Sequence, residues 1–183
     1  MTKIAVHLAT GFEEVEAISI VDVLRRAELD VIMVSMTDTK TVVGGHQIPI
    51  VTDTLFHELD YSTIDVIVLP GGMPGATNLD NHKGLREQIL KFNNEKKLLG
   101  AICAAPLVLG HLGILKRQKA VCYPGFEKEL HGAEVLRDPT TVSDNIVTAR
   151  GIGVALKFGL KLVEEIIGAE KAEELSKSML VEY

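Results

Sequence analysis

The sequence predicts an α/β fold, a doubly wound and mostly parallel sheet sandwiched by helices, in a single domain. Two observations lead to this prediction. Short, almost continuously apolar runs alternate with longer segments whose apolar residues recur at helical spacing. Such runs are typical of parallel strands that are buried on both faces. The repeated order of strand and helix favours right-handed crossovers within one sheet.

The predicted elements follow one another along the chain in that order. Buried strands are predicted over residues 3–9, 30–36, 65–70, 98–103 and 145–150. Helices are predicted over residues 15–28, 81–97, 105–115, 153–167 and 169–180. Residues 41–51 predict a small hairpin or edge excursion, because Pro49 does not suit a central strand. No repeat or linker interrupts the order, so one domain over residues 1–183 is expected.

Composition and charge exclude several classes of protein. The chain has 183 residues, of which 46% are hydrophobic and 24% charged, so it is globular and not disordered. A formal net charge of −6 argues against nucleic-acid and anionic-membrane partners, because both need a basic surface. The sequence predicts no targeting segment and no membrane span. Two cysteines without a zinc-type spacing favour a reducing cytoplasm.

Four loops follow the predicted strands, and they are the places to look for chemistry. In open parallel sheets, ligands bind outside the carboxyl ends of the strands. The loops are TGFEEVE, PGGMPGA, CAAP and RGIG. We expect them to share one edge of the sheet.

The loop CAAP contains a candidate nucleophile, Cys103. Small residues, Ala101 and Ala105, stand two positions before and after it, as in the sharp strand-to-helix turn of a nucleophile elbow. Pro106 suits the first turn of a following helix. A helix N-terminus lowers the pKa of a thiol, so Cys103 is expected to ionise and to oxidise before Cys122. A buried structural cysteine is the alternative, and this segment alone does not decide between them.

Two further loops offer partners for the thiol. Glu16 opens the first predicted helix, and a carboxylic acid buried beside a thiolate would stay protonated and donate a hydrogen bond to sulfur. The same group would serve as a general acid or base. Gly71 and Gly72 allow close backbone approach, and an N–H there can join that of Ala104 in an oxyanion hole. The glutamate has an alternative explanation, because acidic residues often stabilise the start of a helix. The glycines have one too, because they often form ordinary turns.

The segments GFEEVEAISIVDVLRRA, DVIVLPGGMPGATNL, AICAAPLVLG and TARGIGVALKFGLKLVE together resemble the ThiJ/PfpI superfamily. The resemblance is to its parkinsonism-protein branch, which is class I glutamine amidotransferase-like. It implies a flavodoxin-like sheet, a homodimer and an oxidation-prone nucleophilic cysteine. By position it implies that Cys103 is the nucleophile, Glu16 its protonated partner, and Gly72 and Ala104 the backbone donors.

Other positions extend the resemblance or depart from it. Arg26 matches an arginine that reaches toward the partner's site, and His46 stands where relatives often have an anion-binding arginine. Ala104 follows the cysteine where the protease branch has a histidine, so peptidase activity is not expected. Tyr123 replaces a histidine before proline, and a tyrosine with a pKa of about 10 is a poor base near neutral pH. Tyr123, Arg26 and His46 remain predicted substrate or anion contacts.

The sequence thus predicts a cysteine-dependent enzyme acting on small reactive carbonyls, of the glyoxalase or deglycase type. Cys103 would form a hemithioacetal while Glu16 moves the protons, without a metal or an organic cofactor. The alternative is a redox-responsive stress protein or chaperone, in which Cys103 is oxidised to sulfenic or sulfinic acid. The identity of the substrate stays open.

Overall fold

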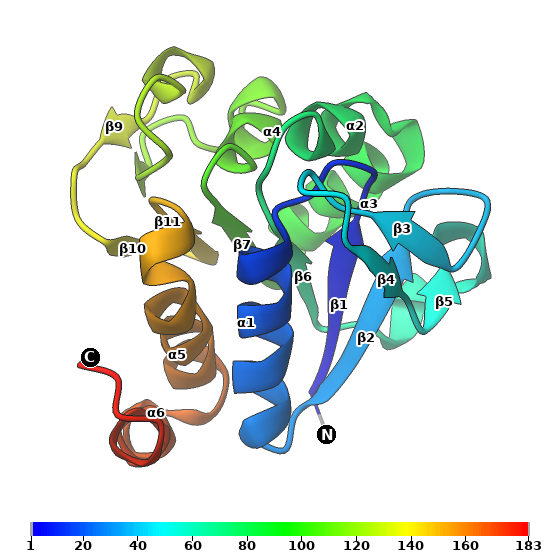
Figure 1. Ribbon diagram of the computed structural model, residues 1–183. Coiled ribbons are helices and arrows are strands. Elements are labelled where there is room, and N and C mark those ends of the chain that lie inside the picture. The colour runs from blue at the N-terminus through cyan, green and yellow to red at the C-terminus, as the bar shows by residue number, and fades with distance from the viewer. Residues whose placement is uncertain (1, 183) are drawn as a thin grey trace.

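A seven-stranded sheet forms the centre of the computed structural model, which describes residues 2–182 (Figure 1). The strand order is β10-β11-β7-β6-β1-β2-β5, and every neighbouring pair is parallel except β10 with β11. The chain enters at β1, extends the sheet through β2 and β5, and then builds the other half from β6 outward. The prediction of a doubly wound, mostly parallel sheet is confirmed.

The strands of this sheet are short, as the apolar runs predict. They are β1 (Lys3–Leu8), β2 (Asp30–Ser35), β5 (Thr54–Leu55), β6 (Val66–Leu69), β7 (Leu98–Ile102), β10 (Thr140–Ser143) and β11 (Ile146–Ala149). Smaller two-stranded sheets pair β3 (Thr41–Val43) with β4 (Pro49–Val51), and β8 (Lys119–Ala120) with β9 (Glu134–Val135). The first of these is the hairpin predicted over residues 41–51.

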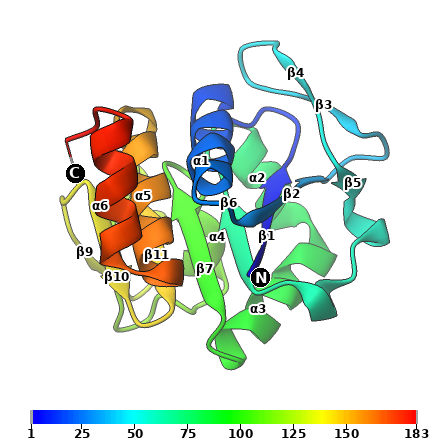
Figure 2. The same ribbon diagram turned by 90° about the horizontal axis from the view of Figure 1, so that it is seen from below.

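Helices cover both faces of the main sheet, as the view from below shows (Figure 2). The α-helices are α1 (Glu14–Arg26), α2 (Gly75–Asn81), α3 (Lys83–Asn94), α4 (Pro106–His111), α5 (Ala155–Ile167) and α6 (Ala169–Ser178). The 3-10 helices are η1 (Phe56–Glu58), η2 (Tyr61–Thr63), η3 (Glu127–Glu129) and η4 (Ile152–Val154). Between residues 2 and 182, no helix has the length and apolar character that crossing a membrane requires.

Two apolar cores, one on each face, hold these layers together. Ile20 and Leu24 of α1 belong to the same buried cluster as Phe158 of α5. On the opposite face, Ile89 and Phe92 of α3 belong to a second buried cluster. The sheet between them is therefore covered on both sides, which explains why its strands are continuously apolar and not alternating.

Two predicted helices have different limits in the structure. The helix expected over residues 81–97 is α3, which covers only Lys83–Asn94, and α2, which was not expected, precedes it and ends beside it at His82. There Nδ1 of His82 accepts a hydrogen bond from the N–H of Leu85 at 3.0 Å and caps α3. The helix expected over residues 105–115 ends at His111, because Gly113 adopts a φ of +73°, which a continuing helix does not allow.

Candidate active site

Cys103 occupies a sharp turn directly after β7. Its φ is +65°, in the left-handed region that residues other than glycine rarely adopt. Its N–H donates to the carbonyl of Ala149 at 2.9 Å, and its carbonyl accepts from the N–H of Tyr123 at 2.8 Å. The two neighbouring segments therefore hold the strained turn in place, as is common where strain presents a functional group.

Glu16 brings a buried carboxyl group to this turn. The residue lies in the first turn of α1 and has no exposed surface. Its Oε2 accepts a hydrogen bond from the N–H of Gly71 at 2.9 Å, and its Oε1 is buried without a hydrogen-bond partner among the described residues. Burial raises the pKa of Glu16 to about 7, although the interactions with the Cys103 thiol and with Gly71 oppose this shift. The carboxyl group can therefore gain or lose a proton near neutral pH.

The thiol of Cys103 is not acidic while Glu16 is ionised. Burial raises the pKa of Cys103 to about 12, and the negative charge of Glu16 adds to the effect. The N–H groups of Gly72 and Ala104 bond to the sulfur and lower the pKa, but by less. Burial also raises the pKa of Cys122, to about 11. Burial thus outweighs the backbone hydrogen bonds at Cys103, where α4 begins only at Pro106, and the expectation that Cys103 ionises before Cys122 stays a prediction.

Glu16 and Cys103 are better described as one coupled pair that shares a single negative charge. With the charge on Glu16, its repulsion keeps the thiol protonated. When the thiol proton passes to Glu16, that repulsion disappears and the carboxyl group becomes a hydrogen-bond donor to sulfur. A base that takes the thiol proton would have to lie where Glu16 lies, so the position of Glu16 suits a general base.

Glycines make the close approach of the four loops possible. A Cβ added at Gly71 would lie 2.5 Å from Cβ of Cys103 and 2.8 Å from Oε2 of Glu16. A Cβ added at Gly151, in the RGIG loop, would lie 3.8 Å from Sγ of Cys103 and 3.1 Å from the ring of Tyr123. The RGIG loop was expected at this edge of the sheet, but Gly151 was not predicted as a site residue. A glycine shortly after a buried strand is the sequence feature that could have indicated it.

The remaining predicted contacts lie further from the sulfur. Tyr123 is half exposed and lines an open pocket of about 350 Å³ together with Arg150 and Ile152. His46 lies between β3 and β4, and its Nδ1 is 2.9 Å from Oε2 of Glu14. This bond and the nearby charge of Glu13 raise the pKa of His46. The structure thus places Tyr123 beside the turn of Cys103, through its N–H bond to the Cys103 carbonyl, and ties His46 to the start of α1.

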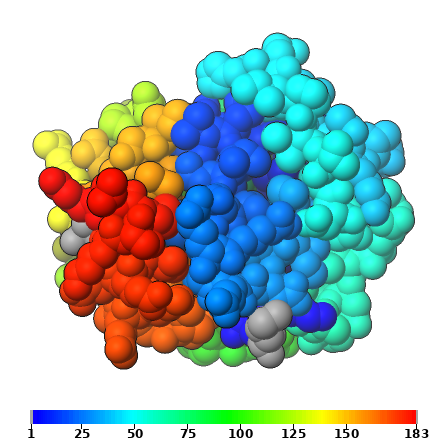
Figure 3. Space-filling model, turned by 60° about the horizontal axis from the view of Figure 1, so that its bottom comes forward, coloured from blue at the N-terminus to red at the C-terminus, as the bar shows by residue number. Residues whose placement is uncertain are grey.

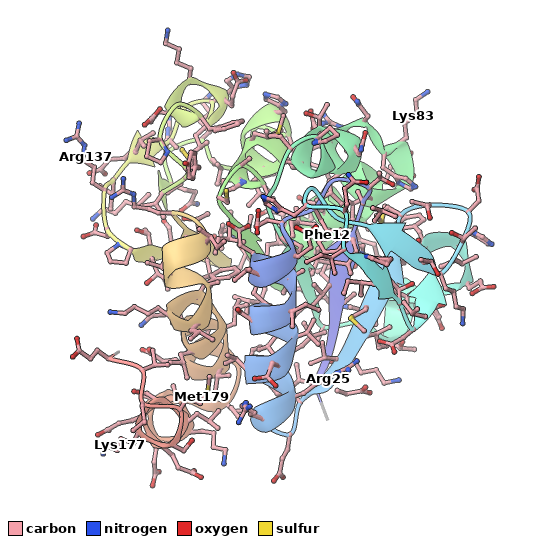
Figure 4. All side chains as sticks on the ribbon, viewed as in Figure 1. Phe12, Arg25, Lys83, Arg137, Lys177 and Met179 are labelled. Carbon is pink, nitrogen blue, oxygen red and sulfur yellow. The ribbon has the colours of Figure 1, made fainter. Side chains whose placement is uncertain are left out.

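Arg26 is at the other end of α1 from the site. Ten residues separate it from Glu16, which corresponds to about 15 Å along a helix axis. Its Nε bonds to Oδ2 of Asp22 at 2.6 Å, and its neighbour Arg25 marks that end of the helix in Figure 4, far from Phe12. Within one chain Arg26 therefore does not reach Cys103. A role for it at the site requires a partner subunit.

Comparisons with known proteins identify the family of the chain. A family model described as the DJ-1/PfpI family matches residues 2–165. The chain belongs to the DJ-1/PfpI family. This DJ-1/PfpI chain is 36% identical to protein dj-1beta of Drosophila melanogaster over 186 residues, which cover all of both chains. It is 34% identical to a Caenorhabditis elegans protein named glutathione-independent glyoxalase DJR-1.2, over 91% of this chain and 89% of that protein.

Plant relatives of the DJ-1/PfpI chain are longer. It is 38% identical to the DJ-1 homologs B and A of Arabidopsis thaliana, over 98% and 97% of its own length. Those alignments cover only 41% and 46% of the plant proteins, so the chain spans less than half of each.

Solved structures of DJ-1 proteins share the fold. A structure described as oxidized DJ-1 of Toxoplasma gondii has a TM-score of 0.96 and 35% identity over 100% of both chains. The structure of Drosophila melanogaster DJ-1beta has a TM-score of 0.95 and 33% identity over 100% of this chain and 99% of that chain. The flavodoxin-like α/β domain implied by the sequence resemblance is confirmed.

Proposed function

We propose that this DJ-1/PfpI protein is a cysteine-dependent enzyme that acts on small reactive carbonyl compounds. The observation that carries this proposal is the pairing of Cys103, in its strained turn, with the buried carboxyl group of Glu16. A nucleophile beside a base that can take its proton is the arrangement that covalent catalysis requires. The name of the C. elegans relative, a glutathione-independent glyoxalase, supports the carbonyl class.

The proposed reaction begins with addition of Cys103 to an aldehyde. A bond forms between Sγ and the carbonyl carbon, the thiol proton passes to Glu16, and the electron pair of the carbonyl moves to its oxygen. The N–H groups of Gly72 and Ala104, which face the sulfur in the resting site, supply donors for that oxygen. Protonation of the oxygen by Glu16 gives the hemithioacetal.

For a 2-oxoaldehyde, proton movement by Glu16 completes an internal redox change. The carboxylate of Glu16 removes the C1 hydrogen as a proton and returns it to the C2 carbon, while the proton of the C1 hydroxyl passes to the C2 oxygen. The C1 hemithioacetal thereby becomes a thioester, and the C2 carbonyl becomes a hydroxyl group. Water then cleaves the thioester, which releases a 2-hydroxy acid and restores the thiol.

A methylglyoxal assay without glutathione tests this proposal. Wild type is expected to convert methylglyoxal to lactate, and Cys103→Ala to lose at least about a thousandfold in kcat/KM, because the nucleophile is removed. Cys122→Ala is the matched control, since it removes the other thiol and is expected to keep the wild-type rate. Turnover by Cys103→Ala at the wild-type rate, or none by wild type, would contradict the proposal.

A redox role for the same cysteine is the second candidate function. The donors around Sγ, from Gly72, Ala104 and protonated Glu16, suit the oxygens of a sulfinic acid as well as a substrate oxygen. The description of the T. gondii structure as oxidized favours this candidate. It predicts that mild peroxide adds oxygen to Cys103 and not to Cys122, as read by mass spectrometry of the digested protein.

The exposed apolar face of α1 leads us to include a homodimer in the proposal. Val15 and Ile18 of α1 are 52% and 42% exposed, and Ile152 and Leu156 are exposed beside them in the η4–α5 segment. Figure 3 shows the surface of α1 (blue) open between α6 (red) and the segment that contains β3 and β4 (cyan). A second copy on this face is also what a role for Arg26 at a partner's site requires.

Sedimentation at micromolar concentration is expected to give twice the 19.9 kDa chain mass. Ile18→Asp is expected to shift the protein to a monomer, because it buries a charge in the proposed interface. Ile167→Asp changes an equally exposed residue at the far end of α5 and should leave the dimer intact. A wild-type monomer would contradict the assembly.

A further inference from the structure

A second cluster of polar side chains lies where α2, α4 and η3 meet, outside the cysteine site. His111 ends α4, Glu129 ends η3, and His131 follows two residues later. Each offers one ligand atom, and these atoms all lie within 4.8 Å of one another. We propose that His111, Glu129 and His131 form a binding site for a divalent transition-metal ion of the zinc type.

His111 is oriented for this role by its neighbour on α2. Its Nδ1 lies 2.7 Å from Oδ2 of Asp80, and its Nε2 lies 2.9 Å from Oε2 of Glu129. Asp80 is mostly buried and is itself held by Arg86. A histidine that binds zinc through one ring nitrogen usually donates a hydrogen bond from the other ring nitrogen to a carboxylate. The cluster therefore contains ligands and the group that positions one of them.

The three side chains need to move little to surround a tetrahedral zinc ion. Tetrahedral zinc holds nitrogen and oxygen ligands at about 2.0–2.2 Å, so two ligand atoms stand about 3.3 Å apart. Nε2 of His111 and Oε2 of Glu129 need to separate by only a few tenths of an ångström from their present 2.9 Å. The ring of His131 is 5.1 Å from that of His111, centroid to centroid, and its side chain is exposed, so it can turn toward the ion.

The donor set favours zinc or a neighbouring transition metal over magnesium and calcium. Two imidazoles and one carboxylate suit borderline ions, whereas the hard cations prefer oxygen ligands alone. When the ion binds, Nε2 of His111 releases its proton to solvent and coordinates the ion through its lone pair. A water molecule fills the fourth position.

An ion bound at this site would stabilise the fold and take no part in catalysis. The ion would join the end of α4 to the segment that contains η3 and His131, two parts of the chain held together here by side-chain contacts. A ligand that binds only the folded chain raises the unfolding temperature. The protein is therefore expected to be stabilised by zinc independently of its cysteine chemistry.

Titration of EDTA-treated protein with zinc chloride tests the site, with heat of binding and unfolding temperature as the two readouts. Wild type is expected to bind zinc and to unfold about 5 °C higher at a hundredfold excess over the dissociation constant. His131→Gln is expected to weaken binding at least tenfold and to lose the thermal shift. It changes an exposed residue, so the fold should survive, and Glu129→Gln provides a second variant of the same kind.

Three further variants separate this site from other places where zinc can bind. His57→Gln removes an exposed histidine that belongs to no such cluster within residues 2–182, and it is the matched control. His46→Gln removes a ligand from the other group, Glu13, Glu14 and His46. Cys103→Ala removes the reactive thiol. All three are expected to keep the thermal shift. Loss of the shift in any of them, its persistence in both His131→Gln and Glu129→Gln, or its absence from wild type would overturn the proposal.

Discussion

Glu16→Gln is expected to lower kcat/KM for methylglyoxal by about 10²–10⁴-fold, the usual contribution of a positioned general base. Glutamine keeps the size of the side chain and can accept from the N–H of Gly71, but it cannot take the proton of the Cys103 thiol. Burial then still raises the pKa of that thiol, with no local group to relieve it. The variant should therefore stay folded and fail in the addition step.

The pH profile gives this prediction a signature that a structural effect would not produce. In wild type the ionised form of Glu16 accepts the thiol proton, and its pKa is about 7. The rate should therefore rise as pH increases through about 7 and level off above it. In Glu16→Gln this inflection should be absent.

Glu14→Gln is the matched control for that profile. Glu14 lies on the same helix and is also buried, but its carboxylate bonds to His46 and not to Cys103. Its pKa is lowered despite burial, because His46 donates to it. The control should keep the inflection near 7. An unchanged profile in Glu16→Gln would mean that another group serves as the base.

The second large effect is expected at Gly71. The Cβ of an alanine there would lie 2.5 Å from Cβ of Cys103 and 2.8 Å from Oε2 of Glu16, distances that force both groups to move. Overpacking of this kind costs about 1–3 kcal/mol in the free energy of unfolding. A misplacement of about 1 Å in a catalytic pair costs about a hundredfold in rate. Gly71→Ala should show both losses, in chemical denaturation and in the methylglyoxal assay.

Gly45→Ala is the comparison that isolates the steric cause. Gly45 lies in the loop between β3 and β4, and a Cβ added there would have its nearest neighbours at 3.6 Å, an ordinary van der Waals distance. The same substitution should leave the rate and the unfolding free energy near their wild-type values. Equal losses in the two variants would show that the close contact at Gly71 is not the cause.

Much of the site follows from the order of the strands. The predicted strands before PGGMPGA and CAAP became β6 and β7, which are neighbours, and the strand before TGFEEVE became β1, which lies next to β6. Because parallel strands end at one edge, Glu16, Gly72 and Cys103 had to come close once that order was established. Arg26 and His46 depend on where a helix ends and where a hairpin folds, and for these the structure gives contacts that the sequence could not.

By itself, the sequence determined the fold class and the strand-end loops, because apolar periodicity and turn residues are local properties of the chain, whereas the prediction of Cys103 and Glu16 as site residues also drew on the family resemblance. Only the tertiary structure decided the acidity of the thiol, since the desolvation of Cys103 and the charge of Glu16 arise from packing between distant segments. The cluster of His111, Glu129 and His131 likewise depends on the tertiary structure. Its residues show no metal-binding spacing, and it exists because α4 and η3 pack together and because Asp80, far away in sequence, orients one ring.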